Sequence, residues 1–198
     1  FYAGGTLGLS SQGHLALSTA AVQATGHVTL GSSQGQISTE QGDEQGIQST
    51  QGNVSLSAKQ GMNLGGTLSS DQASVTLQAD AAINVSGTVH AGTQLNVSDL
   101  QGGGTQDLNN TGTLLADGAL TIQARDVSNS GDAGLQGSGG TRITAQSLTN
   151  SATLVMSTLA TADGQLNLGA LTNTGTIQSA RDLSMSVLTR VTNRGDLL

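Results

Sequence analysis

One serine-containing segment has the spacing of a hydrolase nucleophile. Residues 31–35, GSSQG, match the G-x-S-x-G pattern of a nucleophile elbow. An elbow needs a strand, a sharp turn and a helix within an α/β sheet, and no helical periodicity surrounds this segment. We therefore interpret it as a turn, and the sequence predicts no catalytic residue.

Three histidines are the nitrogen ligands that a metal ion could use. His14, His27 and His90 lie far apart in the sequence, although stacking of the chain could bring His14 and His27 near one another. A zinc site usually needs three or four ligands whose orientation is fixed by further contacts, and no such set is visible. We interpret the histidines as exposed surface side chains.

Two oxygen-rich segments are candidates for calcium sites. Residues 102–107, GGGTQD, partly match the nonapeptide G-G-x-G-x-D, but Thr105 stands where that motif needs glycine and no second copy follows. Glu40, Asp43 and Glu44 form the densest acidic patch, and their carboxylates could also bind calcium. We interpret the patch as a solvated loop, so the sequence predicts no metal and no cofactor.

The tripeptide Arg194-Gly195-Asp196 is the one that integrins recognise. The internal repeat explains its glycine, because Gly195 occupies the same slot as Gly175 and Gly112. Receptor contact is therefore a secondary expectation here. The residues that carry it are Arg194, Gly195, Asp196, Glu40, Asp43 and Glu44.

Composition limits the elements that could position these residues. Phe1 and Tyr2 are the only aromatic residues among 198, and Pro, Cys and Trp are absent, so any core is thin and aliphatic. A net charge of −7 repels nucleic-acid phosphate and anionic membrane surfaces, so we expect neither as a partner. No apolar run approaches the ~18 residues of a membrane span, and the chain lacks an initiating Met, so we expect a soluble piece of a longer protein.

A repeating unit with nearly constant spacing runs along the chain. The triplet Val54-Ser55-Leu56 returns as the similar triplets 75–77 and 95–97, and Gly66 returns at the same spacing as Gly87. The next step, from Gly87 to Gly112, is longer because the glycine insert 102–104 lengthens this unit. Such an insertion is expected to bulge outward without breaking the register.

Each unit holds apolar-polar-apolar triplets separated by Gly, Asn, Asp or Ser. This period of two is typical of short strands with one buried face, and stacked units would pair about 4.8 Å apart. The sequence therefore predicts an all-β parallel β-helix over 1–198, with coils of about twenty residues, about nine coils in all and a length of roughly 40 to 45 Å. Its exposed end strands could associate end to end.

Turn residues recur at fixed places in the unit. The recurring asparagines are expected to stack along the axis and to tolerate left-handed backbone. Asp126 and Asp182, which follow arginines, are expected to form ion pairs in turns. The stretches 38–52 and 128–141 break the alternation and are predicted to be loops or irregular coils. The structural turn residues are Gly66, Gly87, Gly112, Gly175, Gly195, Asn110, Asn173 and Asn193.

Residues 107–131, DLNNTGTLLADGALTIQARDVSNSG, and 171–185, LTNTGTIQSARDLSM, resemble the filamentous-haemagglutinin repeats of two-partner-secretion exoproteins. The similarity lies in NTGT with a following apolar pair and in ARD with a following apolar residue. It covers 107–198, whereas 1–106 match only in periodicity. The resemblance implies a right-handed parallel β-helical shaft outside a Gram-negative cell, exported by an outer-membrane transporter that recognises an amino-terminal domain absent here.

Three functions follow from this reading. The first is the structural shaft of a large adhesin or of a contact-dependent inhibition toxin, both virulence factors, which presents a distal module. The second is direct contact of the loops 38–52 or 128–141 with a target-cell receptor or glycan. The third, a polysaccharide-degrading β-helix enzyme, needs paired carboxylates and aromatic sugar platforms, and the coils hold no aromatic residue. The sequence therefore predicts a secreted or cell-surface protein that is not an enzyme.

Overall fold

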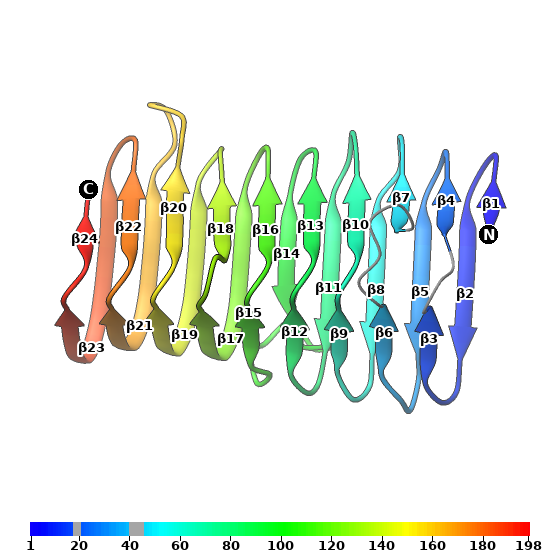
Figure 1. The fold of residues 1–198 in the computed structure, drawn as a ribbon, viewed down its shortest axis with the longest axis horizontal. Helices are drawn as coiled ribbons and strands as arrows, with labels where there is room; N and C mark the ends of the chain where they lie inside the picture. Colours follow the sequence, from blue (N-terminus) through cyan, green and yellow to red (C-terminus); the bar gives the residue numbers. More distant parts are fainter. Residues whose placement is uncertain (18–20, 40–45) are drawn as a thin grey trace.

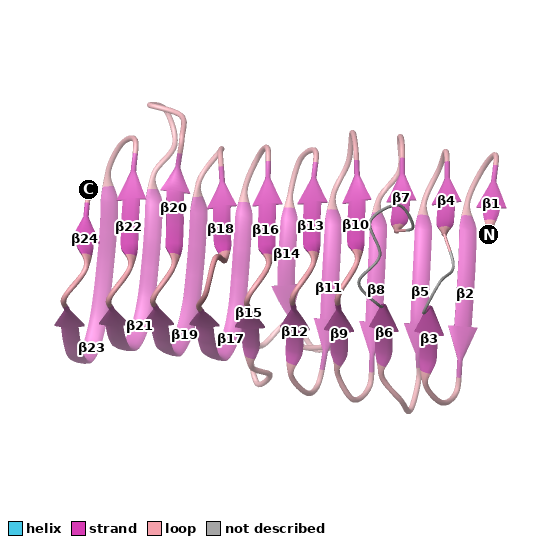
Figure 2. Ribbon diagram, viewed as in Figure 1, coloured by secondary structure: helices cyan, strands magenta, loops and turns pink. Residues whose placement is uncertain are grey.

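The computed structural model describes residues 1–17, 21–39 and 46–198, and these ranges contain strands and turns but no helix (Figure 2). It follows that no membrane-spanning helix occurs within them. The strands stack into a parallel β-solenoid of about nine turns, with the two chain termini at opposite ends of the rod (Figure 1). The prediction of an all-β parallel solenoid is confirmed.

One coil shows how the sequence pattern makes a turn of the solenoid. Strands β8 (Val54–Ala58) and β9 (Met62–Leu64) lie in one sheet, and β10 (Thr67–Ser70) lies in the other. Each strand pairs in parallel with the equivalent strand of the next coil, so that Val54 lies beside Val75. The spacing of the repeat in the sequence is therefore the length of one coil.

The ten-stranded sheet contains one strand from each coil. In spatial order, its members are β1 (Tyr2–Ala3), β4 (Val22–Ala24), β7 (Ile47–Ser49), β10, β13 (Thr88–Ala91), β16 (Thr113–Ala116), β18 (Gly134–Gly137), β20 (Thr153–Ser157), β22 (Thr176–Ser179) and β24 (Asp196–Leu197).

The fourteen-stranded sheet changes character along the rod. Before residue 120 each coil contributes two short strands, and from there on it contributes one long strand that covers both positions. The short strands are β2 (Leu7–Ser11), β3 (Leu15–Leu17), β5 (Val28–Ser32), β6 (Ile37–Thr39), β8, β9, β11 (Val75–Ala79), β12 (Ile83–Val85), β14 (Leu95–Ser98) and β15 (Leu108–Asn110). The long strands are β17 (Leu120–Asn129), β19 (Thr141–Asn150), β21 (Gly164–Asn173) and β23 (Leu183–Asn193).

The core is a narrow column of aliphatic side chains. In β8 and β11 the residues alternate between buried and partly exposed, with Val54, Leu56, Val75 and Leu77 at most 1% exposed. Equivalent residues stack on one another, so the core continues from coil to coil without aromatic rings. Burial of each such side chain contributes about 1.5–3 kcal/mol, which offsets the entropy lost on ordering short strands.

Glycine is required where one coil crosses closely over the next. A Cβ atom on Gly87 or Gly112 would lie 2.1 Å from the carbonyl oxygen of Gly66 or Gly87, respectively. Gly175 and Gly195 meet the same obstacle, at 2.1 Å and 2.0 Å from a carbonyl oxygen of the preceding coil. These turn glycines are needed for close backbone approach, since none of the four has a positive φ.

Buried asparagines form a ladder along the second half of the rod. The Nδ2 of Asn110 donates to Oδ1 of Asn129 (2.9 Å), and the pattern continues through Asn150 and Asn173 to Asn193 at 2.8 Å per step. The first four are fully buried. Their backbones differ from expectation, because every positive φ in the described residues belongs to glycine.

The two stretches expected to be irregular contain regular strands. Residues 128–141 include β18, which pairs with β16 and β20 in the normal register. Residues 46–52 include β7, which pairs with β4 and β10, while 40–45 lie outside the described residues. Gly134 and Gln136 can occupy strand positions because only the alternate positions, such as Leu135, must be apolar. Among the described residues, the glycine insert is irregular, and the register shifts at 155–157 and 168–170.

Removal of one whole coil should shorten the rod and preserve its fold. Deleting residues 54–74 joins Asn53 to Val75, which has the same register as Val54. Spin labels on Gly8→Cys and Ser184→Cys, eight strand steps apart along one outward column, should give a separation of about 38 Å. The deletion should reduce this by about 5 Å in electron–electron double resonance. An unchanged or widely spread distance would contradict the stacking.

Candidate functional site

Within residues 1–17, 21–39 and 46–198, the longest departure from the repeat is the loop 99–107, which we call the insert loop. It joins β14 to β15 on the outside of the rod. Gly102 (φ 72°) and Gly104 (φ 146°) adopt backbone conformations that glycine accommodates without strain. The register survives, since Ile83 still pairs with Leu108.

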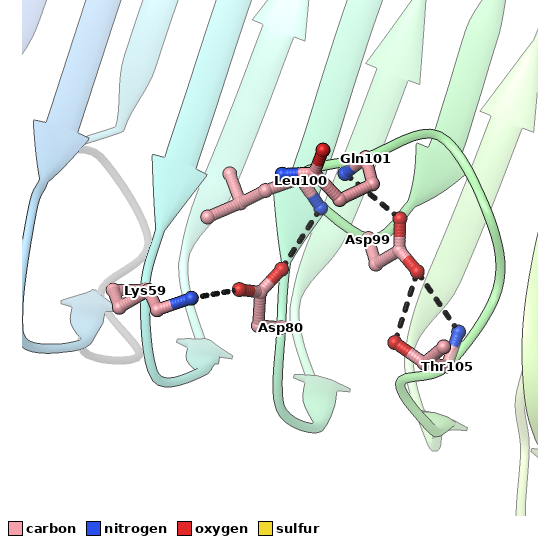
Figure 3. Close-up of polar contacts among 6 residues, drawn as sticks. All are labelled: Lys59, Asp80, Asp99, Leu100, Gln101 and Thr105. Carbon is pink, nitrogen blue, oxygen red and sulfur yellow. Dashed lines mark hydrogen bonds and ion pairs between the residues drawn. The ribbon is translucent and has the colours of Figure 1, made fainter.

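Asp99 holds the insert loop around its own carboxylate. Its Oδ1 accepts the backbone N–H groups of Gln101 (2.9 Å) and Gly103 (2.7 Å). Its Oδ2 accepts the backbone N–H groups of Gly104 (3.0 Å) and Thr105 (3.1 Å) and the Thr105 hydroxyl (2.9 Å). Figure 3 shows the carboxylate facing Thr105 and Gln101. Asp99 is only 3% exposed, so the loop is wrapped around a buried anion.

A second carboxylate anchors the loop to the preceding coils. Asp80 accepts the backbone N–H of Leu100 (3.2 Å) with one oxygen and the ammonium of Lys59 with the other (Figure 3). The three residues lie in turns that follow β8, β11 and β14, one above another. Lys59, Asp80 and the insert loop therefore form a chain of contacts along the rod axis.

These contacts favour the ionised carboxylates. The N–H groups of Gly104 and Gly103 hold the pKa of Asp99 far below its usual range, although burial opposes this. The hydrogen bond from Lys59 lowers the pKa of Asp80. Charge-assisted bonds of this kind are roughly twice as strong as neutral ones, so the insert loop has a fixed shape.

Replacement of the anchoring carboxylate should loosen the loop and leave the rod intact. In Asp99→Ala the N–H groups of Gly103 and Gly104 lose their acceptor, so their exchange with solvent deuterium should accelerate about tenfold or more. The measurement is amide exchange by NMR, with Asp132→Ala, an exposed aspartate in another turn, as the control. Equal exchange rates in all three proteins would contradict the anchoring role.

The same measurement has a defined pH dependence. Because the pKa of Asp99 is lower in the folded than in the unfolded chain, its stabilising contribution is fully present above the unfolded value near 3.9. The contribution is lost progressively as the pH falls from the unfolded value through the lower folded value. Protection of the Gly103 amide, corrected for intrinsic exchange, should therefore stay constant from pH 7 down to about pH 4.

Two hollows flank the insert loop. One groove, of about 620 Å³, runs across the outside of the later coils and is mostly apolar. The other, of about 490 Å³, lies over the earlier coils and is lined largely by serines and glycine. The first groove is lined by Gly103, Gly104, Thr105, Ala124, Ala145 and Leu168 among others, and the second by Ser10, Gly31, Ser33, Ser57, Lys59 and Leu100 among others.

The RGD tripeptide spans the tight turn after β23 and the first residue of β24. Its backbone is bound to the preceding coil, since the N–H of Arg194 donates to Asn173 (2.8 Å) and that of Asp196 to Gly175 (2.9 Å). Arg194 and Asp196 are exposed. The candidates Glu40, Asp43 and Glu44 lie outside the described residues.

The serines of the elbow-like segment lie where β5 ends, Ser32 as its last residue and Ser33 in the turn that follows. The Ser32 hydroxyl donates to the carbonyl of Gly13 (2.5 Å) and accepts the N–H of Gly35 (3.0 Å), and Ser33 is exposed near the Ser11 carbonyl. Both hydroxyls thus contact backbone groups.

The histidines contact different partners, with His14 and His27 in turns and His90 in strand β13. Nδ1 of His14 accepts the N–H of Gln36 (3.3 Å), whereas Nδ1 of His27 accepts that of Asn53 (3.0 Å). His90 faces Asp117 (3.2 Å). In the described ranges, His, Cys, Asp and Glu form no group of three or more that could hold a metal.

One expected ion pair forms with another partner. Arg125 contacts Asp126 (3.3 Å) as expected, although within β17 and not in a turn, and it also contacts Asp107 (2.5 Å), which raises the pKa of Arg125. Arg181 instead contacts Asp163 of the preceding coil (3.3 Å). Stacking brings residues of adjacent coils closer together than some chain neighbours.

The insert loop emerges from the structure as the main candidate for an external contact. The sequence alone did not identify Asp99 as the residue that holds this loop. Its position shortly before the three glycines 102–104 was a signal that could have identified it. No family model, curated protein or solved structure matches the chain.

Proposed function

We propose that this chain is a length of the extracellular shaft of a two-partner-secretion exoprotein, either a haemagglutinin-like adhesin or a contact-dependent inhibition toxin. Two observations support the proposal. The repeat 107–198 resembles filamentous-haemagglutinin repeats in sequence, and the whole described chain forms one parallel solenoid. In this role the protein acts by length and stiffness and catalyses no reaction.

The unbroken stacking of coils carries the proposal. Paired strands continue from β2 to β23 along one sheet and from β1 to β24 along the other, so a force on the axis is shared by many backbone hydrogen bonds. Each added coil extends the rod by about 4.8 Å. A distal binding or toxin module would thereby be held at a set distance from a Gram-negative cell, with an outer-membrane transporter exporting the parent chain.

A second candidate function is direct contact with a receptor or glycan on a target cell. The insert loop favours it, because a rigid protruding loop beside two grooves is a common form of binding surface. This candidate places the contact at 99–107 rather than at 128–141, which forms a regular coil.

Binding of the fluorescently labelled chain to bacterial and epithelial cells separates the two functions. The shaft function requires no saturable binding above that of an unrelated β-solenoid. Saturable binding that is lost on replacing residues 100–105 by a two-residue turn would establish the insert loop as a contact. Loss in Arg194→Ala, with Arg142→Ala as an exposed control, would instead identify the tripeptide.

A further inference from the structure

The hydrogen bonding of buried side chains changes abruptly at the coil 95–119. This coil contains β14, the insert loop, β15 and β16, and we call it the insert coil. Within the described ranges, the buried side-chain atoms without a hydrogen-bond partner in the protein are Oε1 of Gln106, Oδ1 of Asp107 and Oδ1 of Asn110. All three lie close together in this one coil. Each such buried oxygen is unfavourable, because it has lost water without gaining a donor.

The orphan oxygen of Asn110 has a simple structural cause. Every later rung of the asparagine ladder accepts a bond from the rung before it, but the residue before Asn110 in register is Val85, which has no donor. The same column continues through Leu64 and Thr39 in the earlier coils. The ladder therefore starts abruptly inside the insert coil.

Strand pairing is also interrupted there. The long strands β17 and β19 pair from Leu120 to Asn129 with one gap, whereas β17 meets the insert coil through two separate segments, 95–97 and 108–110. Between them the insert loop leaves the sheet, and only isolated bonds remain, such as that from the N–H of Arg125 to the carbonyl of Gln106 (2.7 Å). The insert coil and β17 therefore lack the nearly continuous pairing that β17 shares with β19.

We propose that the rod unfolds as two cooperative blocks that separate at the insert coil, with the later coils persisting after the earlier ones have opened. In a solenoid each coil contacts only its neighbours, so one poorly coupled coil divides an otherwise continuous cooperative unit. The ladder joins the later coils more tightly, because losing one rung leaves the adjacent buried amides unpaired.

Hydrogen exchange as a function of urea, read by mass spectrometry of peptic fragments, tests the proposal. Two groups of fragments are expected, with a boundary between residues 98 and 108. Fragments from β5 to β13 should exchange about tenfold or more faster than those from β17 to β21 at the same urea concentration. A single exchange class, or a boundary elsewhere in the rod, would overturn it.

A matched pair of variants tests whether the start of the asparagine ladder causes the boundary between the two blocks. Val85→Asn supplies the missing donor to Asn110, and its turn continues with Gly87 as that of Asn110 continues with Gly112. It also moves the unpaired start of the ladder to position 85, so fragments from β12 and β13 should join the slower-exchanging block and the exchange difference across residues 98–108 should fall by about fivefold or more. Leu64→Asn, one coil earlier in the same column, cannot reach Asn110 and should increase the difference. Equal differences in the two variants would exclude the ladder start as the cause of the boundary.

Discussion

Asn150→Ala should lower the free energy of unfolding of the later coils by about 3–5 kcal/mol. Asn150 is fully buried, accepts the amide of Asn129 (2.8 Å), and donates to Asn173 (2.8 Å) and to the carbonyl of Thr176 (3.2 Å). Alanine removes these bonds and leaves the Oδ1 of Asn173 without its donor. Urea denaturation followed by circular dichroism gives the change.

The outer asparagine ladder provides the control for this substitution. Asn84 bonds to Asn63 (2.7 Å) and Asn109 (2.8 Å) in the same manner, but its side chain is exposed. Water replaces the lost bonds in Asn84→Ala, so the cost should stay below about 1 kcal/mol. Similar losses for Asn84→Ala and Asn150→Ala would show that burial of the amides does not determine their contribution.

Gly112→Ala should destabilise the rod by about 3 kcal/mol or more. The added Cβ would lie 2.1 Å from the carbonyl oxygen of Gly87, a backbone atom that can move only if the coils separate. Such a separation also strains the strand pairs between β13 and β16. The shift in the urea midpoint measures the effect.

Gly134→Ala is the matched control, because Gly134 pairs with Thr113 in the neighbouring coil and a Cβ there meets nothing within 4 Å. Its stability should stay within about 0.5 kcal/mol of the original chain or rise slightly, since alanine restricts the unfolded state. A destabilisation equal to that of Gly112→Ala would mean that close approach does not explain the turn glycines.

Much of the fold was predictable because similar residue types recur at a spacing that equals the length of one coil. The recurrence of Val54, Val75 and Leu95 at nearly constant spacing specifies which residues stack, and strand alternation specifies which face is buried. The surplus at residues 102–104 correctly predicted an outward bulge that preserves register. Local pattern and global packing agree in these coils, which is why sequence reasoning succeeds there.

The sequence predicted less where contacts join different coils. It also predicted less where a polar composition suggested a loop although a strand forms. The pairing of Arg181 with Asp163 depends on which turns stack, which neighbouring residues along the chain do not reveal. Residues 128–141 are polar and glycine-rich, yet β18 forms because β16 and β20 pair with its backbone from both sides. The anchoring role of Asp99 required knowledge of how the insert loop folds back on it.

The insert loop also shows how such a rod can change over evolution. Its extra residues leave the sheet between β14 and β15 and are held by the carboxylates of Asp99 and Asp80, while the coils on both sides keep their pairing. An outer turn can therefore acquire new surface chemistry without a compensating change in the core. The length of the rod and the chemistry of its surface can therefore change independently of each other. A foreign peptide grafted between Leu100 and Thr105 should likewise leave the pairing of the coils unchanged.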